Sequence, residues 1–323
     1  MANTTANTSP AIKAQVYSDF ILEQINDGYL PDGLHRDVSD FGDGETLYIP
    51  VMGETVLRDY VEDQPVVYDP VDTGQITLQI TEYKQGGTYV TNKLRQDAYA
   101  LQVIESQIPV DHLRRIKDSY ETDLLAVSNE QTLADPNSVN GFDHRWVADS
   151  GATTGIITLE DFLYMKASFD KANVPDEGRI VIVDPIVEAS LNKQIGDEGF
   201  SDNPQFEGLV NEGFSRGRKF VRNIFGWDIW VSNRLPRIAD ETIDGGPQDA
   251  STQITGGLAN LFMCVMDDQH KPFMGAWRQM PTTDGEYNKD FQRDEYVTTA
   301  RWGFGLQRAE TLGVVLTSAS LYK

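Results

Sequence analysis

The segment GFSRG, residues 213–217, has the glycine and serine spacing of the nucleophile elbow found in many hydrolases. In such an elbow Ser215 would stand between a strand and a helix, and an acid and a histidine would follow it in the chain. The preceding residues FEGLVNE do not alternate as a strand does, and His270 is the only histidine after Ser215. We therefore interpret GFSRG as a chance match in a glycine-rich segment and keep a serine hydrolase only as a remote alternative.

Acidic residues that could bind a metal ion gather in two places, DDQH at residues 267–270 and the aspartate-rich segment 37–43. Neither place has the spacing of a calcium loop or of two ligating histidines on a helix. No glycine-rich phosphate-binding motif is present either. The sequence therefore predicts no metal site, no cofactor and no enzymatic activity, and it predicts that these carboxylates are solvated.

Acidic residues outnumber basic ones by 50 to 27, which gives a formal net charge of -23 at pH 7. Nucleic-acid binding depends on Lys and Arg that neutralise phosphates, so this charge argues against a protein that reads DNA or RNA sequence. It is compatible with a protein that surrounds DNA, because a negative surface repels packed phosphates.

Positive charge is concentrated in one segment, SRGRKFVRN at residues 215–223. Its basic side chains are Arg216, Arg218, Lys219 and Arg222, and aromatic residues follow closely. Basic and aromatic side chains together can bind single-stranded nucleic acid. Alternatively, an acidic segment from another copy of the chain could dock on this basic segment. We favour that interpretation because it accounts for both the basic cluster and the acidic excess of the chain.

The chain has 323 residues, of which 40% are apolar, so it is long enough for one large domain or two. The lone cysteine, Cys264, lies in the apolar run LFMCVM and is expected to be a buried, unpaired thiol. No export signal and no run of about 18 apolar residues is visible, so we expect no membrane span.

Two segments alternate apolar and polar residues with the period of a half-buried strand, ETLYIPV at 45–51 and GQITLQITEY at 74–83. About twenty residues connect them, far more than in an ordinary hairpin. This connection contains the single base Arg58 and six acids, Glu54, Asp59, Glu62, Asp63, Asp69 and Asp72. We expect such a loop to contact something outside its own domain.

Residues 110–130 are predicted to form an amphipathic helix, because apolar side chains recur there at spacings of three and four. Pro109 is expected to open this helix. Arg114 and Arg115 lie outside the apolar stripe, where a solvated charged face is the simplest interpretation. A similar stripe predicts a helix at residues 9–28 that needs a partner surface.

The second half of the chain contains further helix and strand signals. Thr158 and the pair Asp184-Pro185 are typical of helix starts. The apolar run RIVIV at 179–183 predicts a buried strand, and FGWDIWVSNRLP at 225–236 alternates as a strand does. Residues 239–252, ADETIDGGPQDAST, are predicted to be a loop, and residues 294–319 are strand-rich.

Three of these segments resemble a known family. NVPDEGRIVIVDPIVEASL at 173–191 combines a Pro-x-x-Gly-Arg turn, an apolar strand, Asp-Pro and a helix. FGWDIWVSNRLP combines a glycine, a strand and Ser-Asn-x-x-Pro, and the closing residues 294–318 complete the order. Together they resemble the major capsid (coat) proteins of tailed double-stranded DNA phages, whose HK-ninety-seven-type fold is shared by encapsulins. The resemblance covers nearly the whole chain.

The resemblance implies an α+β coat-protein fold with an N-terminal arm, an extended β-hairpin loop, a long spine helix with a peripheral β-sheet, and a central α/β axial domain. The implied boundaries are 1–44 for the arm, 45–92 for the extended loop and its flanking strands, 93–175 for the peripheral domain with the spine helix, 176–284 for the axial domain, and 285–323 for C-terminal strands that complete the peripheral domain.

The implied function is that of a virion protein that assembles with itself into hexamers and pentamers of an icosahedral shell. The shell would form in the host bacterial cytoplasm and enclose genomic DNA without sequence-specific binding. A separate scaffolding protein, a portal protein and decoration or cement proteins are the implied partners. An encapsulin, which encloses protein cargo, is the alternative with the same fold. Some family members cross-link through a loop lysine, but residues 54–74 contain none, so no such bond is expected.

We hypothesise that the acidic loop, Glu54 to Asp72, lies across a neighbouring subunit. The candidate basic partners are Arg216, Arg218, Lys219, Arg222 and, on the spine helix, Arg114 and Arg115.

Overall fold

A computed structural model describes most of the chain. The described residues are 30–31, 33–39, 44–53, 55–71, 73–97, 101–130, 137–149, 153–197, 223–248 and 250–319. The helix expected at residues 9–28 and the basic segment 215–223, apart from Asn223, lie outside them.

Within the described residues the helices are α2 (Asn92–Asp97), α3 (Leu101–Ala126), α4 (Leu159–Lys171) and α5 (Pro185–Asp197), with short 3-10 helices η1 (Val127–Glu130) and η3 (Ala309–Thr311). The strands are β1 (His35–Asp37), β2 (Thr46–Met52), β3 (Thr73–Gln79), β4 (Glu82–Thr91), β5 (Arg145–Val147), β6 (Arg179–Val183), β7 (Asn223–Ile224), β8 (Trp227–Val231), β9 (Glu241–Gly245), β10 (Ala250–Ile254), β11 (Gly257–Cys264), β12 (Phe273–Asn288), β13 (Arg293–Leu306) and β14 (Leu312–Ser318).

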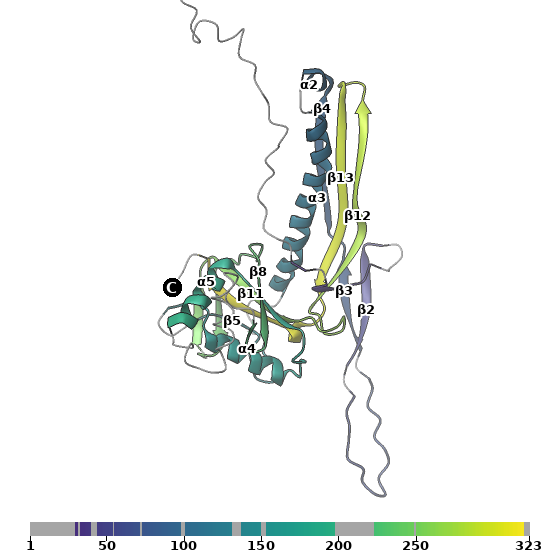
Figure 1. Cartoon of the computed structure of the whole chain (residues 1–323). Coiled ribbons are helices and arrows are strands. Elements are labelled where there is room, and N and C mark those ends of the chain that lie inside the picture. The colour runs from purple at the N-terminus through teal and green to yellow at the C-terminus, as the bar shows by residue number, and fades with distance from the viewer. Residues whose placement is uncertain are drawn as a thin grey trace, which may run out of the picture.

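A four-stranded sheet with the order β1-β12-β13-β4 forms the elongated part of the molecule, and α3 runs along it (Figure 1). Ala300 and Trp302 of β13 are buried together with Ile116 of α3, so the helix covers one face of the sheet. Strand β4 pairs antiparallel with β13, so an early strand and a strand near the C-terminus lie side by side in this sheet.

A six-stranded sheet with the order β5-β14-β11-β6-β8-β7 forms the compact part, with α4 and α5 beside it (Figure 1). Ile180 and Ile182 of β6 belong to one apolar core, and Val181 and Val183 belong to another. Successive side chains of a strand point to opposite faces, so this strand is covered on both faces. That arrangement explains the continuous apolar run RIVIV and confirms the predicted buried strand.

The two helices of this compact part begin where the sequence predicts. The Asp161 carboxylate accepts a hydrogen bond from the backbone N–H of Thr158 at 2.7 Å, which fixes the first turn of α4. The Asp184 carboxylate accepts one from the N–H of Ile186 at 2.9 Å, with Pro185 at the first position of α5.

The segment FGWDIWVSNRLP supplies β8 and the turn before it. Phe225 and Gly226 form the turn with positive φ angles of 50° and 91°, so Phe225 precedes the strand instead of belonging to it. Trp227 is fully buried in the core that contains α4 and α5 side chains, whereas Trp230 packs against the core on the other face. The strand is therefore a structural element of the subunit.

The predicted strands on either side of the acidic loop pair as an antiparallel ribbon, β2 with β3, with Leu47 opposite Leu78 and Ile49 opposite Ile76. The base of this ribbon lies against β13. A Cβ atom at Gly303 would overlap the carbonyl oxygen of Gln79, so this close approach requires glycine. Arg301 also pairs with Glu45 at 2.8 Å, which fixes the ribbon on the sheet.

Two local predictions were wrong. Helix α3 begins at Leu101, so Pro109 lies inside it and does not open it. A proline inside a helix lacks one backbone hydrogen bond, and packing of the helix on the sheet offsets that loss. Residues 239–252 are not only a loop, because β9 and β10 form a hairpin there through five paired positions.

Strand pairing also divides the chain differently from the implied boundaries. Strand β14 lies in the six-stranded sheet, although residues 285–323 were assigned to the peripheral domain. Strand β5, from the segment 93–175, joins the same sheet, whereas most of β12, from the segment 176–284, pairs with β13 in the four-stranded sheet. The chain passes between the two sheets at β4–β5, at β11–β12 and at β13–β14, so neither sheet is formed by one continuous segment.

Candidate assembly surfaces

The loop between β2 and β3 extends away from the rest of the molecule (Figure 1). Its tip is a turn in which the N–H of Gln64 donates to the carbonyl of Val61, and Asp63 has a positive φ of 65°. Asp59, Glu62, Asp63 and Asp69 are all exposed, as a docking loop requires. Glu54 and Asp72 lie outside the described residues.

One of the predicted contact residues already has a partner within the loop. Nε and Nη2 of Arg58 donate to the Asp69 carboxylate at 3.0–3.1 Å. This bidentate pair joins the two arms of the loop, and such pairs hold a defined geometry. Arg58 therefore has a structural role inside the loop, and Asp69 is not available as a simple acidic contact.

Large apolar side chains of the loop are also exposed, which the sequence analysis did not predict. Leu57 is 98% exposed, Tyr68 is 90% exposed and Tyr60 is 85% exposed. Further exposed residues of this kind are Val56, Val61, Val66, Val67 and Val71. Contiguous exposed apolar side chains mark interaction surfaces. The valine-rich run PVVYDPV at 65–71 could have indicated this apolar surface, but the predicted contacts were based on the acidic residues around it.

Helix α3, which carries the basic candidates Arg114 and Arg115, runs along the four-stranded sheet, whereas the loop between β2 and β3 extends away from it (Figure 1). Arg114 is half-buried and Arg115 is exposed on α3, and each has an interaction within the chain. The structure therefore does not bring the acidic loop and these arginines together in one subunit. Arg216, Arg218, Lys219 and Arg222 lie outside the described residues, as does Ser215.

A polar cluster on α3 connects three parts of the subunit, and the sequence analysis did not predict it. Arg234, which follows β8, donates to Asp118 at 2.8 Å and to Glu121 at 3.4 Å. Glu121 also accepts from the N–H of Leu30 at 3.4 Å and from the hydroxyl of Ser232 at 3.3 Å. Burial raises the pKa of Glu121, and Arg234 opposes that shift.

The acidic side chains of the segment 267–270 have hydrogen-bond and ion-pair partners within the chain. Asp267 accepts hydrogen bonds from the N–H groups of Gln269 and His270 and lies 2.5 Å from His270 Nδ1. The hydrogen bond from the His270 side chain lowers the pKa of Asp267. Asp268 pairs with Lys271 at 2.7 Å. Among the described residues no group of His, Cys, Asp and Glu is arranged to bind a metal ion.

His144 is buried, and its ring stacks on Phe169 with the centroids 5.5 Å apart. Its Nδ1 lies 3.3 Å from the carbonyl oxygen of Phe142, whereas Nε2 has no partner within the described chain. Burial lowers the pKa of His144, although the Phe142 carbonyl and the charges of Asp143 and Glu310 oppose the shift. Burial in the folded protein therefore favours the neutral form of this imidazole.

Replacing His144 with phenylalanine is expected to reduce the loss of stability in mild acid. The pKa of His144 is lower in the folded than in the unfolded chain, so the unfolded chain gains a proton first as the pH falls below about 6.5. That proton uptake destabilises the wild type, and phenylalanine cannot take it up. Urea midpoints at pH 7.5 and pH 5 measure the effect. An equal fall in both proteins would show that His144 does not contribute, since every other titrating group is common to both.

Comparison with known proteins identifies the family. A family model described as phage capsid protein matches residues 73–317, from β3 to β14. The chain belongs to the phage capsid protein family. No curated protein matches the capsid protein in sequence. None of its helices, in the part of the chain that the structure describes, is long and apolar enough to cross a membrane.

Solved phage structures share the fold of the capsid protein. The capsid of the cyanophage P-SCSP1u is similar with a TM-score of 0.70 and 14% identity, over 96% of this chain and 94% of that one. A chain of Mycobacterium phage Che8 has a TM-score of 0.63 and 15% identity, over 94% and 97%. The capsid of Ralstonia phage GP4 has a TM-score of 0.62 and 10% identity, over 100% of both chains. The predicted coat-protein fold is thereby confirmed.

Proposed function

We propose that this capsid protein assembles with itself into hexamers and pentamers that close an icosahedral shell around the double-stranded DNA of a tailed phage. The observation that carries the proposal is the extended loop, residues 55–71, whose large apolar side chains the subunit leaves in water. Burial against a neighbour stabilises each such side chain by about 1.5–3 kcal/mol. Repetition of one interface by rotation produces closed rings and shells.

The remaining parts of the proposal concern partners and location. With a net charge of -23, the protein would enclose DNA without binding its sequence and would act as a structural protein, not an enzyme. Assembly would take place in the host bacterial cytoplasm with separate scaffolding, portal and decoration proteins. The match to the phage capsid family favours this reading over an encapsulin.

We further propose that the loop lies across a neighbouring subunit, with its acidic tip near basic side chains such as Arg115 of α3. Asp59 and Glu62 are exposed on the loop, and Arg115 is exposed on the helix. Within one subunit the loop extends away from α3, so the proposed contact would be made with a second copy (Figure 1). Opposite charges across such an interface favour one orientation of docking.

Reversing two charges on the loop, with Asp59→Lys and Glu62→Lys, is expected to raise the protein concentration needed for shell formation about tenfold at low salt. Asp63 is left unchanged because its positive φ suits aspartate. Negative-stain microscopy and light scattering across a protein dilution series measure the threshold. The difference should shrink as salt is added, because salt screens exposed charges.

The matched control carries the same change of charge elsewhere, with Asp240→Lys and Asp244→Lys on the exposed side of the β9 segment. If the loop variant and this control assemble alike at every salt concentration, the charge contact is wrong. If the wild type forms no shells at any concentration, even when it is expressed with its neighbouring genes so that a scaffolding protein is supplied, the proposed function itself is wrong.

A further inference from the structure

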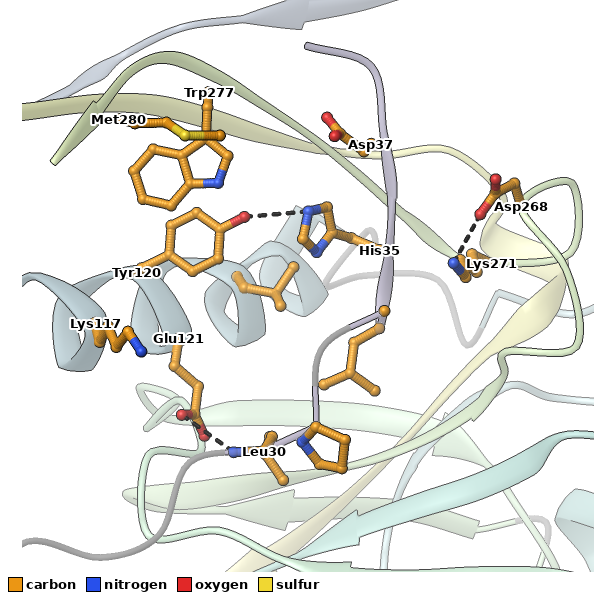
Figure 2. A pocket seen from close by; sticks show the side chains of 14 residues that line it. Leu30, His35, Asp37, Lys117, Tyr120, Glu121, Asp268, Lys271, Trp277 and Met280 are labelled. Carbon is orange, nitrogen blue, oxygen red and sulfur yellow. Dashed lines mark hydrogen bonds and ion pairs between the residues drawn. The ribbon is translucent and has the colours of Figure 1, made fainter.

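A cavity of about 640 Å³ lies at the junction of α3, the segment 30–37, the first residues of β12 and the loop at 268–271 (Figure 2). Leu34 and Leu124 on its walls are buried, and Leu30 packs against the same core. Its volume is in the range of pockets that bind ligands or anchor side chains. Neither the family match nor the proposed function explains why the subunit has this cavity.

Aromatic rings form one side of the cavity. Tyr120 and Trp277 stack with their centroids 4.4 Å apart and their planes at 5°. The Tyr120 hydroxyl lies 3.1 Å from Nε2 of His35, so its position is fixed (Figure 2). Met280, which is 68% exposed, lies beside Trp277 at the edge of the cavity (Figure 2). This arrangement is apolar and preformed, and aromatic and methionine side chains of this kind predominate at protein interfaces.

The acids of the cavity are largely satisfied from within the subunit. Glu121 accepts from the N–H of Leu30, and Asp268 pairs with Lys271. Lys117 also stands at the wall, and it too has an interaction within the chain. The cavity therefore offers an occupant mainly apolar and aromatic surface, so a segment with large apolar side chains would match it best.

The loop between β2 and β3 has this composition. Leu57 and Tyr68 are the most exposed of its large apolar side chains, at 98% and 90%. Each stands next to a member of the Arg58–Asp69 pair, which holds the two arms of the loop together at that level. Two anchors held at a fixed spacing lose less conformational freedom on binding. Asp59 follows within two residues of Leu57.

The loop of the same subunit does not reach this cavity, because it extends away from α3 (Figure 1). We propose that the cavity receives Leu57 and Tyr68 from the loop of a second copy. The inference rests on the proposed assembly and adds the place where the loop is anchored. Tyr68 would lie near Met280, and Leu57 would lie against the apolar walls.

The test replaces Tyr68 with photoreactive benzoylphenylalanine, which keeps an aromatic side chain, and irradiates assembled particles. Mass spectrometry then identifies the peptides that become cross-linked between chains. We expect cross-links to the peptides that contain Met280 and Tyr120. The matched control places the same photoreactive residue at Val66, which is 72% exposed on the same loop, and these peptides should be cross-linked there at least fivefold less.

Cross-links that instead reach residues 1–29, another surface of the neighbour, or both positions equally would overturn the anchoring site. If the modified chain alone fails to assemble, a one-to-twenty mixture with wild-type chains provides mosaic particles for the same measurement. Particle formation by the wild type is measured separately. Absence of particles when the wild type is expressed with its neighbouring genes contradicts the proposed function, whereas particles with cross-links elsewhere contradict only this inference.

Discussion

Replacing residues 54–72 with Asn-Gly is expected to leave a folded subunit that forms no shells. The change removes the eight large apolar side chains that the loop exposes. Burial of only two of them per interface would contribute about 3–6 kcal/mol, or roughly two to four orders of magnitude in association. Because every subunit of a shell repeats the contact, the loss multiplies over the particle.

The fold itself should tolerate this change. Met52 pairs with Thr73 at the end of the β2–β3 ribbon, so a short glycine-containing turn can join the strands. Circular dichroism should give a melting temperature within a few degrees of the wild type, while light scattering shows subunits only. In a second variant, a Gly-Ser segment of the same length replaces residues 54–72. This variant distinguishes the effect of loop length from the effect of the side chains. Shells of normal size from either variant would contradict the prediction.

Glu241→Ala is expected to destabilise the subunit by about 3–5 kcal/mol, because it leaves a buried charge without its partner. Arg145 donates from Nε and Nη2 to the two carboxylate oxygens of Glu241, both at 3.0 Å. The side chains are 0% and 5% exposed. The pair joins β5 of the six-stranded sheet to β9, so its loss acts on the compact half of the molecule.

Urea unfolding measures this effect, and a double variant provides the control. Arg145→Met together with Glu241→Leu removes both charges and keeps similar volumes, so its stability should lie within about 1 kcal/mol of the wild type. Arg145→Met and Glu241→Leu, each measured alone, complete the cycle that gives the coupling energy of the pair. A Glu241→Ala protein as stable as the wild type would show that the guanidinium finds water or another partner.

Local patterns in the sequence predicted much of the fold. The alternation of Leu47 and Ile49 against Ile76 and Leu78 predicted the ribbon, because a strand with one covered face has a period of two. RIVIV predicted a strand covered on both faces. Thr158 predicted the start of α4, where the Asp161 carboxylate accepts a hydrogen bond from the backbone N–H of Thr158.

Other elements depended on contacts that no local pattern records. The hairpin of β9 and β10 contains aspartate, glycine and threonine, which locally favour a loop, and it is fixed by Glu241 reaching Arg145. Pro109 stands inside α3 although prolines usually begin helices. Tertiary packing prevailed over local preference in both places.

The candidate surfaces were predicted only in part. The acidic residues of the loop and their exposure could be predicted from its length and composition, since hairpin connections are ordinarily short. The exposure of Leu57 could not be, because an apolar side chain in sequence is expected to be buried. The cavity beside Tyr120 and Trp277 joins segments about 150 residues apart, and only the folded chain brings them together.

The pairing of β4 with β13 also has a consequence for synthesis on the ribosome. Glu82 is opposite Trp302, so β4 emerges about 200 residues before its partner strand, or roughly 10–40 seconds earlier at common translation rates. Throughout that interval β4 and the loop between β2 and β3 lack strand β13, against which they are fixed in the folded chain. Newly made chains are therefore most prone to mispairing with one another before their C-terminus is released, and a chaperone that binds nascent chains would raise the yield of soluble subunits.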